Sequence, residues 1–457
     1  MMGGMASEET RTQHHPLIRG SAAAEPRQAT AVPPTRAGRR TAPGTSPARA
    51  WTTRLVVVGI VLSALNLRPA ITSLGALLEE VRDGLGMSGS VAGVLTSVPP
   101  LCFAVFGVMA PRLARRFGPG AVVCAGMVAI AAGLLVRPYA GGTAGFLAAS
   151  ALALMGIAVS NVLMPVIVKR WFPDRVGSMT GLYSMALALG TSLAAAVTVP
   201  ITEALGGSWQ SGLALWAALA AAAVVPWIPF VRDRGGVRDR GSASAETPGR
   251  EPHAREEATA APALRITRSR TAWALAVFFG LQATAAYITM GWMAQIFRDA
   301  GVPAGRAGLL LAVTMVMGVP LALVIPRLAT RLPQQGPIVF ALGVCGLAGY
   351  AGLYVAPAGG AWAWALLLGV SNCAFPLALT MVGMRARTGA GVAQLSAFAQ
   401  STGYLISIPG PLLVGVLYQH SGGWGLPLAL MAALMVPQMA VGFLAGRDRT
   451  VEDEAAR

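Results

Sequence analysis

Charged residues are scarce in this sequence. Only 12% of its 457 residues are Asp, Glu, Lys or Arg, whereas Ala, Val, Ile, Leu, Met, Phe, Trp, Tyr and Cys together make up 54%. Soluble domains carry about 25% charged residues, so this composition excludes an ordinary soluble protein and indicates one that is embedded in a membrane. All 19 Asp and Glu fall in tails, loops or the ends of apolar runs, so we expect no carboxylate deep inside a span.

Three further scarcities exclude several chemistries. The four cysteines are scattered singly, which argues against a zinc site or a disulfide framework, and the four histidines fall in tails or loops. Since Lys169 is the only lysine, there is no glycine-rich phosphate loop with a following lysine, which argues against ATP hydrolysis by this chain. No nucleophile, base and acid occur together either. We therefore expect no catalytic residues, no metal, no cofactor and no enzyme activity.

What the sequence has is a series of long apolar runs. Runs of about 20 residues are long enough to cross a bilayer as helices. They predict twelve transmembrane helices, at roughly 54–78, 88–110, 119–137, 143–168, 176–199, 209–231, 271–297, 305–327, 336–355, 361–384, 391–415 and 424–445. The predicted fold class is an all-α integral membrane protein.

Positive charge lies mostly on one side of these helices. Of the 35 Lys and Arg, only four fall on the other side, namely Arg82, Arg137, Arg298 and Arg306. Cytoplasmic loops carry an excess of Lys and Arg, so we expect a multi-pass protein of the plasma membrane with both termini in the cytoplasm. The net charge of +16 is largely this asymmetry, and no nucleic-acid partner is expected.

Two stretches without apolar runs divide the chain. Residues 1–50 lack periodicity and are predicted to be a disordered cytoplasmic tail. A secretory signal would place its apolar core within the first 15 to 30 residues or so, and none occurs there, although an organellar transit peptide remains an alternative. Residues 232–270 are predicted to be a cytoplasmic linker between a half at 51–231 and a half at 271–446, with 447–457 as a second cytoplasmic tail.

The two predicted halves are related in sequence. Ala92–Leu95 and Pro111–Arg116 recur, at the same spacing, as Ala307–Leu310 and Pro326–Arg331. A second echo pairs Ser160-Asn161-x-x-x-Pro165 in the fourth helix with Ser371-Asn372-x-x-x-Pro376 in the tenth. Six helices, a linker and six related helices are typical of an internally duplicated membrane protein with its site between the halves.

One charge lies inside a predicted span. Arg68 stands in Leu65–Ala70, where an arginine at the centre of a helix costs about 2.5 to 3.5 kcal/mol on insertion scales. Glu79 and Glu80 lie about three helical turns further on, where the span is ending. The unpaired cation is best explained by a polar cavity that an anionic or strongly dipolar solute can enter. The alternative is an arginine whose head reaches a membrane face, but the neighbouring Asn66 and Pro69 favour a built site.

The chain resembles the major facilitator superfamily over about residues 51–446 and, more narrowly, the cyanate and nitroimidazole transporter family (CynX/NimT type). The resemblance is carried by Asn66–Ala70 with Thr72 and Ser73, Gly93–Phe103, Ala110–Gly118, Trp171–Tyr183 and Gln400–Pro411. It implies two pseudo-symmetric six-helix halves and alternating access. One departure is Pro111, where the superfamily's loop has Asp. The predicted gating loop keeps its basic residues, which are Arg112, Arg115, Arg116, Arg327 and Arg331.

Polar side chains in the spans are further site candidates, since a buried amide needs hydrogen-bond partners. With Arg68, the predicted solute-binding residues are Asn66, Asn161, Gln282, Asn372 and Gln400, on helices that line the central cavity in the fold the chain resembles. Each amide could instead join two helices. A weaker set of cavity aromatics is Tyr183, Tyr287, Trp292 and Tyr404, for which packing is the alternative.

The predicted function is secondary active or facilitative transport of a small anionic or polar solute, which the resemblance narrows to a cyanate-like anion or a small nitrogen heterocycle. We expect a monomer with the solute and the lipid bilayer as its partners. Two alternatives stay open. Efflux of apolar drugs would make Arg68 structural, and a membrane sensor would bind solute without transporting it. Because no carboxylate is expected deep in a span, we expect no obligatory proton carried on a buried side chain.

Overall fold

The computed structural model describes residues 47–231 and 266–455, and within them every regular element is a helix. Twelve helical segments of the described chain are long and apolar enough to cross a membrane, at or close to the predicted positions. The all-α fold class is therefore confirmed. The predicted tail at 1–50 and the predicted linker at 232–270 lie largely outside the described residues.

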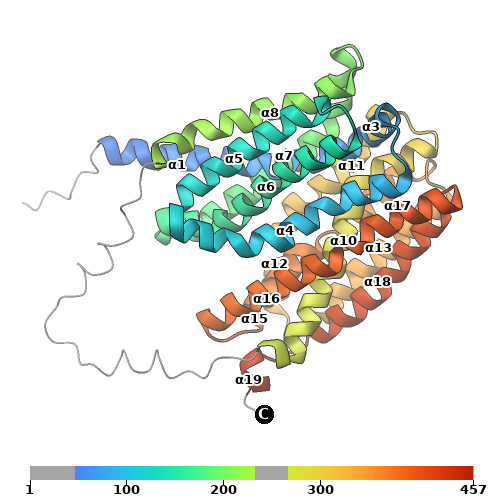
Figure 1. The fold of residues 1–457 in the computed structure, drawn as a ribbon. Helices are drawn as coiled ribbons and strands as arrows, with labels where there is room; N and C mark the ends of the chain where they lie inside the picture. The colour runs from blue at the N-terminus through green and yellow to red at the C-terminus, as the bar shows by residue number, and fades with distance from the viewer. Residues whose placement is uncertain (1–46, 232–265, 456–457) are drawn as a thin grey trace, which may run out of the picture. The chain divides into compact units, whose positions relative to one another are not determined.

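The first six spans form one half, drawn from blue to green in Figure 1. The first span is broken into two helices, and a short helix follows it before the second span. The elements are α1 (Pro47–Asn66), α2 (Pro69–Ala76), α3 (Leu78–Leu85), α4 (Gly89–Phe117), α5 (Pro119–Val136), α6 (Thr143–Trp171), α7 (Val176–Ala204) and α8 (Trp209–Val224).

The last six spans form the second half, drawn from yellow to red. Three of these spans are broken, and a short helix closes the described chain. The elements are α10 (Arg270–Asp299), α11 (Ala304–Val316) with α12 (Gly318–Arg331), α13 (Gly336–Val355), α14 (Ala361–Ser371) with α15 (Ala374–Met384), α16 (Gly389–Ser407) with α17 (Pro409–Ser421), α18 (Gly425–Ala445) and α19 (Val451–Ala455).

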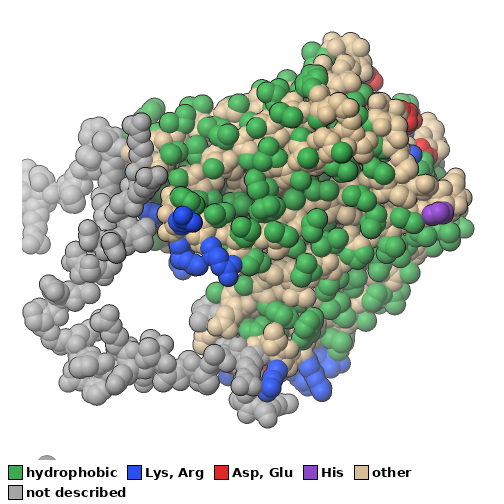
Figure 2. All heavy atoms as spheres, in the orientation of Figure 1, with side chains coloured by type: hydrophobic (Ala, Val, Ile, Leu, Met, Phe, Trp, Pro, Cys, Tyr) green, Lys and Arg blue, Asp and Glu red, His purple; other side chains and the backbone are tan. Residues whose placement is uncertain are grey.

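The two ends of the bundle differ in charge, and Figure 2 shows Lys and Arg at one end and Asp and Glu at the other. We call the end with Arg112, Arg116 and Lys169 the basic end, and the end with Glu80 and Asp299 the acidic end. Hydrophobic side chains cover the flank between them in this view. Such a flank suits contact with lipid tails, and the protein is a multi-pass membrane protein.

The repeated Ala-Gly pairs lie where the halves touch. A Cβ atom at Gly93 of α4 would be 2.9 Å from the Leu412 carbonyl oxygen of α17, and one at Gly308 of α11 would be 2.6 Å from the Ala195 carbonyl oxygen of α7. Only glycine lets these backbones approach so closely. The sequence echo therefore marks two equivalent helix contacts between the halves.

The first span breaks at Arg68 because of the proline that follows. Pro69 begins α2, where its missing N–H is not needed, and the residue before a proline is disfavoured in the helical region. Arg68 accordingly has φ −128° and ψ −27°, outside the regular helix. The break holds the arginine at the junction of α1 and α2.

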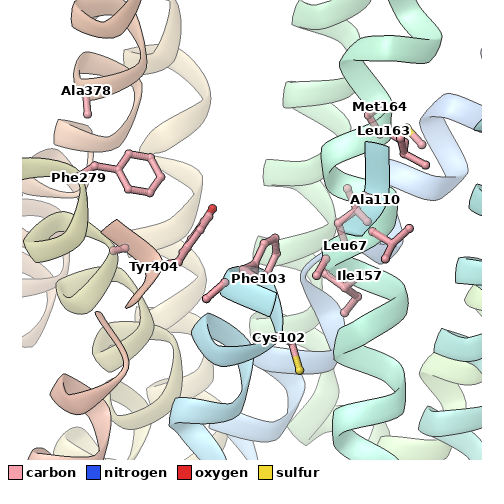
Figure 3. Packing of buried hydrophobic residues seen from close by; sticks show 14 of the residues in the cluster. Leu67, Cys102, Phe103, Ala110, Ile157, Leu163, Met164, Phe279, Ala378 and Tyr404 are labelled. Atoms are coloured by element: carbon pink, nitrogen blue, oxygen red, sulfur yellow. The ribbon is translucent and has the colours of Figure 1, made fainter. Parts of the chain in front are cut away.

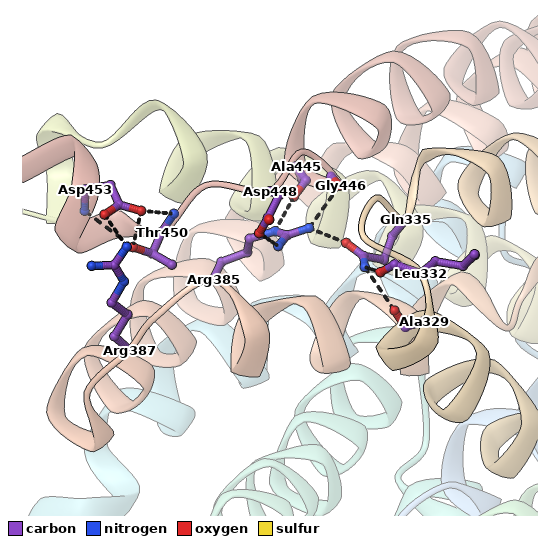
Figure 4. Close-up of polar contacts among 10 residues, drawn as sticks. All are labelled: Ala329, Leu332, Gln335, Arg385, Arg387, Ala445, Gly446, Asp448, Thr450 and Asp453. Carbon is purple, nitrogen blue, oxygen red and sulfur yellow. Dashed lines mark hydrogen bonds and ion pairs between the residues drawn. The ribbon is translucent and has the colours of Figure 1, made fainter. Parts of the chain in front are cut away.

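The chain after α18 folds back onto the second half at the basic end (Figure 4). Arg385, between α15 and α16, is buried and donates to the carbonyl oxygens of Ala445 at 3.0 Å and Gly446 at 2.9 Å. Glu454 of α19 accepts hydrogen bonds from the Ser269 hydroxyl at 2.6 Å and the Thr271 N–H at 3.2 Å. We call residues 446–455 the C-terminal clasp, because they tie the start of α10 to the loop before α16.

Candidate solute-binding site

Arg68 lies half-buried between the two halves, among aromatic rings. Its Cζ atom is 5.8 Å from the ring centroid of Phe103 in α4. The guanidinium is also close enough to interact electrostatically with the hydroxyls of Tyr183 in α7, Tyr287 in α10 and Tyr404 in α16. A cation over an aromatic face is stabilised by about 0.5 to 2 kcal/mol, depending on how far it is desolvated.

The rings around Arg68 also pack on one another. The centroids of Phe103 and Tyr404 are 5.0 Å apart with an interplanar angle of 27°, and Figure 3 shows the two rings facing each other. Phe279 meets Tyr404 edge to face at 5.2 Å. We call Phe103, Tyr183, Tyr287 and Tyr404 together the aromatic cluster of the site. Phe103 and Phe279 were not predicted as site residues, because a phenylalanine in an apolar run carries no signal that separates cavity from core.

No described carboxylate pairs with Arg68. Within the described chain the ion pairs involve Arg298, Arg385 and Arg387 only. The Tyr287 hydroxyl, which is buried and faces the guanidinium, makes no well-formed hydrogen bond within the described residues. The site therefore combines a cation without a counter-ion and an unused hydroxyl donor, which together suit the negative end of a solute.

Two of the predicted amides meet each other inside the second half. Gln282 of α10 donates to both oxygens of Asn372, the backbone carbonyl at 3.2 Å and the side-chain Oδ1 at 3.1 Å. Its own Oε1 accepts from Gln438 of α18 at 2.7 Å. Gln438 was not predicted, although it is a lone amide in an apolar run. This network joins three helices and holds the break between α14 and α15.

The remaining predicted amides lie in different surroundings. Asn66 is buried and donates to the carbonyl oxygens of Leu62 at 2.8 Å and Leu219 at 3.2 Å, so it joins α1 to α8. Gln400 donates to Ser396 of its own helix at 2.7 Å. Asn161 is half-buried and makes no hydrogen bond with another described residue. Asn161 thus joins no helices through its amide among the described residues, whereas the amide N–H of Asn66 is engaged by Leu62 and Leu219.

Trp292 lies apart from the aromatic cluster. It is fully buried towards the acidic end, donates to the Thr96 hydroxyl at 3.1 Å and packs against Tyr418 and Trp424 with centroids at 6.1 and 5.8 Å. Its hydrogen bond joins α10 of the second half to α4 of the first. Trp292 therefore belongs to the contact that closes the acidic end.

An ion-pair cluster completes that closure. Arg298 of α10 lies 2.8 Å from both Glu79 and Glu80 of the first half. Nearby, α2 and α10 are so close that a Cβ atom at Gly75 would overlap the Met290 carbonyl oxygen. In this conformation, these contacts between the halves therefore separate the aromatic cluster from the acidic end.

The basic residues of the predicted gating loop lie on helices rather than in a loop. α4 continues past its predicted end near 110 to Phe117 and carries Arg112, Arg115 and Arg116, while α12 carries Arg327 and Arg331. Pro111 does not end α4, and arginines suit the last turns of a helix because the helix dipole is negative there. All five arginines are exposed, and Figure 2 shows the surface notched at the basic end between two groups of Lys and Arg.

The fold is that of a membrane transporter of small solutes. The family model of the Major Facilitator Superfamily matches residues 56–408, and the chain belongs to that superfamily. A protein solved in an inward-facing and occupied conformation, a bacterial homologue of the human lysosomal transporter Spinster, shares the fold with a TM-score of 0.67 at 14% identity. That match covers 88% of this chain and 97% of the other.

The narrower resemblance is also confirmed. The chain is 31% identical to the 2-nitroimidazole transporter of Escherichia coli (strain K12) over 405 residues, which cover 87% of this chain and 96% of the relative. It is 30% identical to the cyanate transport protein CynX of the same organism over 383 residues, with coverage of 84% and 94%.

Proposed function

We propose that this transporter carries a small solute whose negative or strongly dipolar end binds Arg68. The observation that carries the proposal is the guanidinium without a carboxylate partner, at the interface of the halves, among rings from both of them. Cyanate is a slender anion, and 2-nitroimidazole is a flat ring with a polar nitro group. Both would offer an oxygen to the guanidinium and fit among aromatic faces.

Asn161, Gln400 and the Tyr287 hydroxyl would supply further hydrogen bonds to such a solute. Asn66, Gln282 and Asn372 would then contribute indirectly, because their hydrogen bonds hold the helices that carry the site. Since one chain contains both walls of the site, a monomer would suffice for transport.

The basic end would face the cytoplasm, by the bias of Lys and Arg toward cytoplasmic segments. The described conformation, sealed at the acidic end, would then be the inward-facing one, and both termini would be cytoplasmic at the plasma membrane. Alternating access would separate α10 from α2 and α3 at the acidic end and bring the basic ends together. The exposed arginines of α4 and α12 would meet new partners in that second state.

Variants of Arg68 test the proposal. Arg presents a planar fork of donors that Lys cannot copy, so Arg68→Lys should lose much of the affinity although the charge is kept, and Arg68→Ala should lose binding altogether. The measurement is thermal stabilisation of the purified protein by cyanate and by 2-nitroimidazole, since a solute at 100 times Kd stabilises by about 2.7 kcal/mol. Uptake into proteoliposomes is the second measurement.

Arg306→Ala is the matched control, because Arg306 lies outside the site at the start of α11 and should leave binding unchanged. Transport by both Arg68 variants at the parent rate would make the residue structural and refute the proposal. Equal stabilisation of parent and Arg68→Ala by apolar drugs alone would favour drug efflux instead. Binding that is normal in the parent, with no flux in proteoliposomes, would favour a sensor.

A further inference from the structure

A second arginine is buried on the acidic-end side of the bundle. Arg137 was expected at the end of the third span on that side, but its side chain turns inward and is only 2% exposed. Its Nη1 donates to the Ala70 carbonyl oxygen at 3.0 Å and its Nη2 to the Ser73 hydroxyl at 3.5 Å. Neither partner is charged, and no described carboxylate forms an ion pair with Arg137. A buried cation costs several kcal/mol unless it is compensated.

Arg137 lines a small cavity whose wall is mostly apolar but also carries a few polar residues. The walls include Thr96 of α4, Ser150 of α6 and Tyr287 of α10. Three buried polar atoms of these residues lack a hydrogen-bond partner within the described chain, namely Nε of Arg137, Oγ of Ser150 and Oη of Tyr287. All three carry a hydrogen that can be donated. A cation without a counter-ion and three unused hydrogen-bond donors around one cavity are the groups that would bind an anion.

The two halves share this cavity. α2, α4, α6 and Arg137 of the first half supply most of its wall, and Tyr287 and Gly291 of α10 supply the rest. In the described conformation it has room for little more than a water molecule. A movement of α10 away from α2 and α4 would widen it, and this is the same movement that opens the acidic end.

We propose that Arg137, Ser150 and Tyr287 form a second anion-binding site, a station between Arg68 and the acidic end that fills when the halves part there. Its ligand is a small monovalent anion of the kind carried at Arg68. Tyr287 connects the two sites, because its hydroxyl interacts with Arg68 and its side chain lines the cavity. The identity of the anion rests on the proposed function, whereas the presence of the site does not.

Charge-selective labelling tests this site. Cys102, Cys124, Cys345 and Cys373 are replaced by Ala in the full chain, and Ser150→Cys is added. An anionic and a cationic methanethiosulfonate reagent are then compared in detergent. At Ser150→Cys we expect the anionic reagent to react on the order of ten times faster than the cationic one, and a tenfold preference corresponds to about 1.4 kcal/mol. The ratio of the two rates is divided by the same ratio at Leu426→Cys, an exposed position of α18. Thiocyanate should slow the reaction, and the bulkier gluconate should not.

Variants of the arginines separate the explanations. Arg137→Gln should abolish the preference, whereas Arg82→Gln, which alters another half-buried arginine of the acidic end, should keep it. Arg68→Ala should also keep it, so the site can be confirmed even if the proposed function fails. A preference that survives Arg137→Gln, or equal reaction of both reagents with Ser150→Cys in the otherwise cysteine-free chain, would overturn the proposal. Should Arg137→Gln fail to fold, Arg137→Lys must retain the preference, and thiocyanate must protect Ser150→Cys in the chain that keeps Arg137. Failure of either refutes the site.

Discussion

At the scale of single residues, depth in the membrane was predictable and hydrogen-bond partners were not. The apolar run around Arg68 placed the arginine inside a span, and the structure holds it there without a carboxylate. Asn66 stands two residues away, yet its amide joins α1 to α8, because the direction of a side chain depends on helix rotation and on the carbonyl of Leu219, which no local pattern encodes. Arg137 is the converse case, because the sequence places it at the end of a span and the structure turns its side chain into the bundle.

Glu454 is a residue whose contribution should depend on pH. Burial alone would raise the pKa of its carboxyl, but hydrogen bonds from Ser269 and Thr271 outweigh burial and hold the pKa below its ordinary value of 4.5. A lowered pKa means that the folded state favours the charged form. The stabilisation is therefore fully present above the ordinary value and is lost as the pH falls through the lowered one.

Glu454→Ala should accordingly lower the melting temperature at pH 7 by about 1 to 2 °C, the size expected of a carboxylate at a helix N-terminus in a chain of this length. The difference from the parent should vanish once the pH is below the lowered pKa. Calorimetry of both proteins across that range is the measurement. Asp83→Ala, at an exposed carboxylate of the acidic end, is the control, and an equal loss in the two variants would contradict the role of the C-terminal clasp.

At the scale of helices, the positions of the spans followed from apolar length, but their breaks did not. The first span breaks at Arg68, directly before Pro69, whereas Pro111 lies inside the continuous α4. The difference lies in the surroundings, because tertiary packing decides whether the hydrogen bond missing at a proline is replaced or tolerated. The repeated Ala-Gly pairs were visible in the sequence, but their role needed the structure, which brings Gly93 and Gly308 to equivalent contacts between the halves.

Gly308→Val tests that contact. Its side chain would be forced against the Ala195 carbonyl oxygen, which lies 2.6 Å from the position of an added Cβ atom, so α11 and α7 would have to separate. We expect transport to fall by about tenfold or more, since a clash of this kind typically costs about 1 to 3 kcal/mol. The matched control is Gly305→Val in the same helix, where an added Cβ atom would meet nothing within 4 Å. Parent-like uptake by both variants in proteoliposomes would show that the close approach is dispensable.

At the scale of the whole molecule, twelve spans and two related halves could be read from the sequence, but the conformation could not. Which end is closed depends on a few contacts, among them the pairs of Arg298 with Glu79 and Glu80 and the hydrogen bond from Trp292 to Thr96. The two conformations differ in free energy by only a few kcal/mol, and one sequence encodes both of them. The same contacts matter for energy coupling, because Glu79 and Glu80 are carboxylates that an opening movement would release.

We predict that a solute gradient or anion exchange drives transport, with no obligatory proton on a buried side chain. Proton-driven transporters commonly titrate an Asp, Glu or His inside the membrane, whereas the residues identified around Arg68 are aromatic, and arginine does not release its proton at physiological pH. Cyanate stays ionised near neutral pH, so in proteoliposomes without a membrane potential an imposed pH gradient should fail to concentrate it, while cyanate trapped inside should accelerate its exchange. Proton coupling could still arise by protonation of Glu79 or Glu80 at the acidic end, which would weaken their ion pairs with Arg298. Accumulation driven by the pH gradient, and lost in Glu79→Gln or Glu80→Gln, would therefore show that opening of the acidic end is itself the proton-coupled step.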